Sequence, residues 1–240
     1  MRTRIRHGLA AVLTVSALSL TAACGGSTDG GDKKAADKPA ADKPAAEPTT
    51  AAAAPLTAAQ MKAATLELKD LPSGWKNSTG PDTPEPKADK PECQPLAGFV
   101  AKEISGATMG PSAHFERGNA ESVLSTYVFT YPAAGATDFV KSLGTSLDTC
   151  KGFAAELQGM KMDVTLEKLA GPKAGEESHA FRLKMKLAQM AMTVESNMMV
   201  VRQGTGVAKI VHVPANASGH KDFDALAKLA ADRFVKGAQS

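Results

Sequence analysis

Apolar residues recur at helical spacing in four segments of the chain. In the first, apolar positions from Met61 to Leu71 fall on one face of a helix, and Thr57 with Gln60 matches the capping-box pattern of a helix start. Pro72 then ends the helical pattern. The same spacing predicts three further helices, over residues 93–104, 134–150 and 221–235.

Alternation of apolar and polar positions predicts six strands. The first two flank Gly118-Asn119, a dipeptide that favours a turn. Because most strands follow one another without a crossover helix, we expect antiparallel pairing. The fold class is therefore α+β, a curved antiparallel sheet of about six strands with the helices packed on one face. The predicted strands cover residues 112–118, 121–132, 162–169, 178–187, 190–202 and 206–213.

The alternation is clearest over residues 178–201, where it predicts a hairpin with its turn at Ala188-Gln189. In this register every apolar side chain of the two strands lies on the same face of the sheet. The other face receives a favourable pair of opposite charges. The predicted cross-strand pairs are Leu187–Met190, Met185–Met192, Leu183–Val194 and Arg182–Glu195.

Methionine is concentrated around this hairpin, since seven of the ten lie between residues 160 and 199. Thioethers bind Cu(I), and Met190-x-Met192 is similar to a copper motif, but these residues lie among Leu, Val and Phe. Core packing is the favoured interpretation, because methionine fills gaps in a chain with only 5% aromatic residues. An adaptable binding surface is the second interpretation, and we expect a partial ligand cleft near Met185, Met190 and Met192.

A stripe of aromatic residues lies on the second predicted strand. Tyr127, Phe129 and Tyr131 alternate along one face, as residues of a strand do when they point to the same side. Core packing explains such a stripe better than a platform for a ligand.

The first 23 residues have the three parts of a secretory signal. Arg2, Arg4 and Arg6 precede an apolar run from Leu9 to Leu20, which is too short to span a bilayer, and small residues follow. Cleavage by a general signal peptidase is one interpretation. The stretch before Cys24 also resembles a bacterial lipobox, in which the cysteine becomes the lipidated first residue. Two or more acyl chains on Cys24, such as a diacylglyceryl group with palmitate, anchor a protein stably.

The cysteine count favours lipidation. The chain has Cys24, Cys93 and Cys150, and an exported protein avoids an unpaired thiol. If Cys24 carries lipid, one pair remains. Cys93 and Cys150 both fall on the apolar sides of their predicted helices, so we expect a disulfide between them.

Residues 24–55 form a polar tether in this interpretation. After Cys24 the segment has no aromatic residue and no Val, Ile, Leu or Phe, and it repeats Ala-Asp-Lys-Pro-Ala, so we expect disorder. One globular domain then covers residues 56–240. Without Arg2, Arg4 and Arg6 the chain has 25 basic and 25 acidic residues, which gives no argument for nucleic-acid binding.

The residue types that usually carry catalysis or bind metals, such as His, Cys, Ser and the acids, form no recognised catalytic or metal motif. No nucleophile elbow and no phosphate-binding loop occurs in the sequence. "EESH" at 176–179 and "HKDFD" at 220–224 contain metal-ligand residue types without the spacing of a zinc site. We interpret the first as a solvated turn and the second as acids at a helix start. We therefore expect no enzyme, no cofactor and no metal.

Four stretches of the domain resemble the extracellular sensor-domain family named for the mycobacterial receptor kinase PknH. They are "LTAAQMKAATLELKDLPSGW", "PECQPL", "YVFTYPAAGATDFVKSLGTSLDTC" and the closing helix. The family also occurs as free lipoproteins in actinobacteria. The resemblance implies an α+β fold with a cleft for an extracellular ligand, and it carries no catalytic residue over.

These observations predict a lipoprotein on the outer face of the cytoplasmic membrane of a Gram-positive, actinobacterial-type cell. Its partners would be the membrane, through the lipid anchor, and a small apolar ligand or a component of the cell wall or envelope. Two alternatives stay open. One is a carrier of lipid or apolar molecules similar to the lipoproteins LppX and LprG, and the other is a structural component of the envelope.

Overall fold

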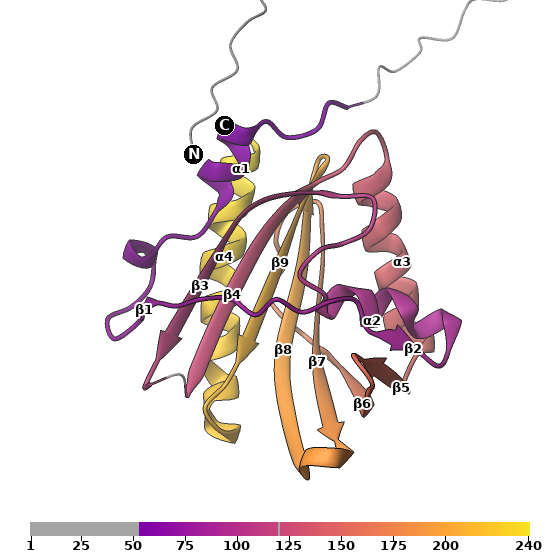
Figure 1. The fold of residues 1–240 in the computed structure, drawn as a ribbon. Helices are drawn as coiled ribbons and strands as arrows, with labels where there is room; N and C mark the ends of the chain where they lie inside the picture. The colour runs from indigo at the N-terminus through magenta and orange to yellow at the C-terminus, as the bar shows by residue number, and fades with distance from the viewer. Residues whose placement is uncertain (1–52, 120) are drawn as a thin grey trace, which may run out of the picture. The chain divides into compact units, whose positions relative to one another are not determined.

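The computed structural model describes residues 53–119 and 121–240, and its central element is a sheet of nine strands (Figure 1). The strands lie in the order β1-β3-β4-β9-β8-β7-β6-β5-β2, and all neighbouring pairs are antiparallel. The predicted α+β class with an antiparallel sheet is confirmed. The predicted signal sequence, Cys24 and nearly all of the tether lie outside the described residues.

The strands come in three consecutive runs, β1–β2, β3–β4 and β5–β9, with a helix before each run and α4 after the last. The helices are α1 (Ala58–Ala64), α2 (Gln94–Val100), α3 (Gly135–Thr149) and α4 (Phe223–Ala238). The strands are β1 (Lys76–Asn77), β2 (Lys87–Ala88), β3 (Thr108–Arg117), β4 (Ser122–Thr130), β5 (Gly152–Leu157), β6 (Met160–Leu169), β7 (Glu177–Leu187), β8 (Met192–Gln203) and β9 (Gly206–Val213).

Helices pack on both faces of the sheet, so the prediction of helices on one face is wrong. Along β8, Met198 and Val200 face a core built with α2 and α3, whereas Met199 and Val201 face a core built with α1 and α4. Residues 198–201 form an unbroken apolar run, and a run of that kind is typical of a strand that is buried on both sides.

We call these two layers the α3-side core and the α4-side core. The α3-side core includes Leu96, Phe99, Tyr127, Phe129, Val140, Leu143, Leu147, Phe181, Leu183, Met198 and Val200. The α4-side core includes Met61, Trp75, Phe115, Leu124, Met199, Val201, Ile210, Phe223, Leu226 and Phe234.

The sheet has three more strands than the sequence pattern predicted. β1 and β2 are the outermost strands and have two residues each, which is too short to produce a pattern. β5 was missed although Phe153 and Ala155 alternate with polar or exposed positions and face the α3-side core. The turn after β5 uses Gln158 and Gly159 at positive φ, of 51° and 80°.

Two predicted helices end early. α1 ends at Ala64, and a separate 3₁₀ turn covers Leu68–Asp70. α2 ends at Val100, four residues before the predicted end. The capping box is present: the Thr57 hydroxyl oxygen accepts a hydrogen bond from the Gln60 N–H at 3.2 Å, and Gln60 Oε1 accepts one from the Thr57 N–H at 2.9 Å.

The β7–β8 hairpin forms, but its predicted register is wrong by two residues. Ala188–Met190 forms a 3₁₀ turn and Ala191 follows at positive φ, so the connection is longer than the two residues predicted. A shift of two residues keeps each side chain on its face, so the apolar face is unchanged. The observed pairs include Leu187–Met192, Met185–Val194, Lys184–Glu195 and Arg182–Asn197.

The described chain begins beside the β8–β9 turn. The Thr205 hydroxyl donates a hydrogen bond to the Ala54 carbonyl at 2.9 Å. The β7–β8 turn lies at the other end of β8, which has 12 residues. At about 3.3 Å per residue these two ends are about 40 Å apart. The predicted tether therefore joins the domain at the end opposite the methionine-rich turn.

Candidate functional site

A disulfide joins the start of α2 to the end of α3. Cys93 immediately precedes α2 and Cys150 immediately follows α3, and their Cα atoms are 5.5 Å apart. Both side chains are buried in the α3-side core. The predicted pair is thus present, and it ties together two helices that are far apart in the sequence.

A groove of about 610 Å³ lies between these two helices. One wall comes from α2 and the segment before it, the other from α3, and the loop after α2 completes the rim. The lining of the groove is largely apolar, with Ile104, Tyr131, Phe139 and three prolines. Its lining residues are Glu85, Pro91, Gln94, Pro95, Gly98, Ile104, Ser105, Gly106, Tyr131, Pro132, Gly135, Asp138, Phe139 and Ser142.

Aromatic rings pack under the groove. Tyr131 stacks on Phe139 with ring centroids 5.6 Å apart, and Phe139 stacks on Phe99 at 6.2 Å. Gly135 allows this packing, because a Cβ at that position would lie 3.0 Å from the Tyr131 ring. Phe139 is half-buried and lines the groove, so part of this aromatic surface is open to a ligand.

The Tyr131 hydroxyl is buried without a hydrogen-bond partner among the described residues. Only 4% of the residue is exposed, and burial raises the pKa of the hydroxyl well above its ordinary value. The group therefore keeps its proton at neutral pH and can donate a hydrogen bond. A buried polar group without a partner costs free energy, which a bound acceptor would recover.

Two carboxylates line the groove without a basic partner. Glu85 Oε1 accepts a hydrogen bond from the neutral Gln94 amide at 2.8 Å. Asp138 lies in the first turn of α3, and its carboxylate makes no hydrogen bond or ion pair within residues 53–119 and 121–240. No Lys or Arg lines the groove. Its electrostatic character is therefore acidic.

The methionines predicted to form a cleft lie elsewhere. Met185 is half-buried against the α3-side core, while Met190 and Met192 are 58% and 40% exposed at the β7–β8 turn. The α2–α3 groove and four further hollows on the described chain are lined by other residues. The cleft near these three methionines stays a prediction. The candidate ligand site in the structure is the α2–α3 groove.

Sequence reasoning missed the groove because it needs two stretches that are about 40 residues apart in the sequence. Residues 91–98 supply one wall and residues 131–142 the other. The one residue in the sequence that could have pointed to the groove was Tyr131, the last residue of the predicted aromatic stripe. Tyr127 and Phe129 are core residues as predicted, and Tyr131 is both a core residue and part of the groove floor.

A lysine is buried beneath the same layer. Lys209 on β9 is 1% exposed, and its ammonium lies 4.2 Å from the Tyr127 ring centroid and also faces Phe99 and Phe129. Its Nζ donates a hydrogen bond to the Ala101 carbonyl at the end of α2. Burial lowers the pKa of Lys209 from 10.5 to about 7.

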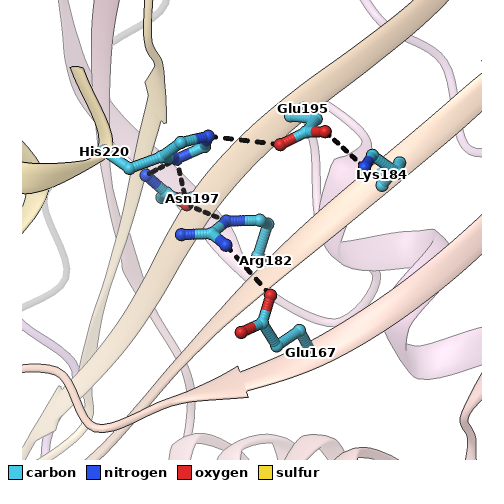
Figure 2. A network of polar contacts seen from close by, with 6 residues as sticks. All are labelled: Glu167, Arg182, Lys184, Glu195, Asn197 and His220. Carbon is cyan, nitrogen blue, oxygen red and sulfur yellow. Dashed lines mark hydrogen bonds and ion pairs between the residues drawn. The ribbon is translucent and has the colours of Figure 1, made fainter. Parts of the chain in front are cut away.

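On the other face of the sheet, a polar network crosses three strands (Figure 2). Arg182 donates hydrogen bonds to Glu167 and Asn197, both at 2.9 Å. Asn197 contacts His220 Nδ1 at 2.9 Å, and His220 Nε2 lies 3.2 Å from Glu195. Lys184 completes the network with an ion pair to Glu195 at 2.6 Å. The hydrogen bond from Lys184 is the main cause that lowers the pKa of Glu195.

The shifted register explains why the predicted Arg182–Glu195 pair is absent. In the observed register Glu195 lies opposite Lys184, and Arg182 lies opposite Asn197. The two charges still reside on the predicted polar face. His220 belongs to the turn Ala217–Asp222 before α4, so the network joins the strands to the start of that helix.

Most of the other Glu, His and Asp residues in the segments 176–179 and 220–224 pair with neighbouring side chains. Glu176 contacts Arg202, and His179 lies 3.2 Å from Glu177. Asp222 pairs with Arg117 at 2.6 Å, and Asp224 lies in the first turn of α4 as interpreted from the sequence. Among the described residues, no group of three or more His, Cys, Asp and Glu side chains is placed to hold a metal ion.

One serine and one histidine are in hydrogen-bond contact in the α4-side layer. Ser122 Oγ lies 3.1 Å from His212 Nε2, and Nδ1 of this histidine has no partner in the described chain. Burial lowers the pKa of His212 to about 4. Such a pair can activate a nucleophile, but both side chains are buried, and neither residue lines the groove or the four further hollows on the described chain.

Within the described ranges, no helix has the length and apolar character needed to cross a membrane.

Comparison with known proteins gives a likeness in structure. The crystal structure of the extracellular domain of PknH from Mycobacterium tuberculosis matches with a TM-score of 0.55, over 78% of this chain and 99% of that chain, at 14% sequence identity. The two share a fold. The resemblance to this sensor domain is therefore supported at the level of the fold.

A second solved structure matches more weakly. It is a putative uncharacterized protein from Mycobacterium smegmatis, with a TM-score of 0.39 and 10% identity over 77% of this chain and 96% of that chain. The sequence itself matches no protein-family model and no curated protein.

Proposed function

We propose that this chain is a non-catalytic surface lipoprotein that binds a small ligand in the groove between α2 and α3. The observation that carries the proposal is Tyr131, a residue that lines the groove and whose buried hydroxyl lacks an acceptor among the described residues. The fold shared with the extracellular domain of PknH supports an extracytoplasmic binding role. In this role the protein captures or presents its ligand.

The lipid anchor is a separate part of the proposal, because Cys24 lies outside the described residues. The apolar run before Cys24 and the even number of remaining cysteines support it. Replacing Cys24 with Ala should release the protein from the membrane or leave an uncleaved precursor. A Cys24→Ala chain that stays processed and membrane-bound would show that lipid is not the anchor.

Ligand binding is tested by native mass spectrometry of the mature chain from cells that export it. Ser142 is exposed on α3 and lines the groove, so Ser142→Trp should block the groove without disturbing the core. We expect a co-purifying small molecule on the wild type and its loss from Ser142→Trp. Thr137→Trp is the matched control, since Thr137 is exposed on the same helix and does not line the groove. Equal occupancy in all three chains would contradict the groove as the site.

The lipid-carrier alternative is less well supported. An acyl chain needs an enclosed, mostly apolar cavity, whereas the groove is open and bears Glu85 and Asp138. The exposed Met190 and Met192 are the observation that keeps this alternative. A mass that identifies the co-purified molecule as an intact lipid would favour it.

A further inference from the structure

The charges around the α2–α3 groove narrow the class of ligand that it can take. Most carboxylates of the polar networks pair with Lys, Arg or His, as Glu195 does with Lys184. The two in the groove differ, because Glu85 is bonded only to the Gln94 amide and Asp138 has no partner in the described chain. An anion in the groove would meet two negative charges and no positive side chain.

We propose that the groove binds an organic cation, a molecule with an amine or guanidinium group and a flat apolar body. This inference rests on the proposed function. The cationic group would lie near the carboxylates of Glu85 and Asp138, and the apolar body would rest on Phe139. An oxygen acceptor on the ligand would receive the hydrogen bond that the Tyr131 hydroxyl can donate.

The position of Glu85 is determined by the start of α2. Its carboxylate lies above Gly98, where a Cβ would be 3.2 Å from Glu85 Oε1. The bond to Gln94 holds this oxygen, and Gln94 Oε1 in turn accepts a hydrogen bond from the Ala88 N–H at 2.9 Å. The carboxylate is thus held in place by a neutral group and has no basic partner in the described chain.

The acceptor that Tyr131 lacks is the second, independent observation. Its hydroxyl stays protonated because burial raises its pKa, so it can donate a hydrogen bond to an acceptor on a ligand. A ligand that combines a cation with a carbonyl, hydroxyl or ether oxygen would satisfy both the carboxylates and this hydroxyl. A purely hydrocarbon ligand would satisfy neither.

Three probes with one apolar body and different charge test the inference. 4-Phenylbutylamine, 4-phenylbutanol and 4-phenylbutyrate are titrated into the exported chain without its lipid, residues 25–240, and the amide NMR signals of Gly98, Asp138 and Phe139 are followed. We expect the amine to bind about tenfold more tightly than the carboxylate, with the alcohol between them. Added salt should weaken this preference.

Variants of the lining residues then show which side chains cause the preference for the amine over the carboxylate. Asp138→Asn and Glu85→Gln should each reduce the ratio of amine to carboxylate affinity. Asp148→Asn is the matched control, because Asp148 is an exposed carboxylate on the same helix that pairs with Lys168 and does not line the groove. Tyr131→Phe should weaken the binding of 4-phenylbutanol, which carries an oxygen acceptor, more than that of the amine.

The outcomes separate this inference from the proposed function. Equal affinity for the three probes, or tightest binding of the carboxylate, would overturn the cation preference and leave the groove as a binding site. If no probe shifts the groove signals in the wild type, and Ser142→Trp behaves identically, the groove itself is not a site and both proposals fail.

Discussion

The two faces of the sheet are built from neighbouring residues of the same strands, yet they differ in how completely helices close them. On the α4 side, small residues allow very close packing of α1 and α4, and a Cβ on Gly237 would lie 2.2 Å from the Ala64 nitrogen. On the α3 side, the two helices are joined by a disulfide and leave a groove between them. A ligand site therefore fits the α3 side, where packing is incomplete and a buried hydroxyl lacks a partner among the described residues.

The faces also differ in their polar groups. The α3 side buries a cation, Lys209, among aromatic rings. On the α4 side the same face of the sheet also carries the polar network of Figure 2. In this network each charge has a partner of opposite sign or a neutral hydrogen-bond partner. Both sides keep a buried polar atom without a partner in the described chain, Tyr131 on the α3 side and His212 on the α4 side. Of these two residues only Tyr131 lines a hollow, the α2–α3 groove.

Removing the disulfide should produce the largest effect on stability. Cys93 and Cys150 are 57 residues apart, and closing a loop of that length stabilises a fold by about 4 kcal/mol in the chain-entropy model. The double variant Cys93→Ser with Cys150→Ser should lose about this free energy of unfolding in urea. The effect should be larger on the α3 side, so hydrogen exchange should accelerate in α2 before it does in α4. Uniform acceleration in both helices would contradict the proposed difference between the faces.

Replacing a core methionine should produce the next largest loss of stability. Met199 is fully buried in the α4-side core, so Met199→Ala should destabilise by about 2–5 kcal/mol. Met185 is only half-buried, so Met185→Ala should cost less, and a cleft there would show as altered binding of an apolar dye. Thermal melts and a dye titration on both variants make the comparison. A large loss of stability in Met185→Ala with unchanged dye binding would remove the predicted methionine cleft.

The buried lysine should make stability depend on pH. The pKa of Lys209 is about 7 in the folded protein and 10.5 when exposed, so the unfolded chain binds more protons between these values. The free energy of unfolding should therefore rise from pH 7 towards pH 10 through this group. Lys209→Met keeps the apolar stem and should flatten that rise in urea titrations. An identical rise in the variant would mean that other groups cause it.

The ion pair between Lys184 and Glu195 should have the smallest effect. The Lys184 side chain is 53% exposed, and pairs of this kind contribute about 0.2–1 kcal/mol. A double-mutant cycle with Lys184→Met and Glu195→Gln measures the coupling directly. A coupling above about 2 kcal/mol would show that this cross-strand pair is far stronger than an exposed ion pair.

The sequence alone determined much of the local structure and the faces of the strands. Alternation placed Phe181, Leu183, Met185 and Leu187 of the β7–β8 hairpin on one face correctly, because a strand repeats every two residues whatever it pairs with. The prediction that every apolar side chain of the hairpin shares that face is wrong, since Met199 and Val201 lie in the α4-side core. Thr57 and Gln60 located a helix start through local hydrogen bonds. The inward positions of Cys93 and Cys150 and the odd cysteine count were enough to predict the disulfide.

Only the tertiary structure decided the register, the layering and the groove. A shift of two residues leaves the hydrophobic pattern unchanged, so the longer turn at 188–191 was needed to bring Glu195 opposite Lys184. The run Met198–Val201 is compatible with one helical layer or two, and the packing of α3 and α4 on opposite faces settled it. The groove depends on Glu85 lying across from the segment that holds Tyr131 and Asp138, and a local pattern carries no information about such an arrangement.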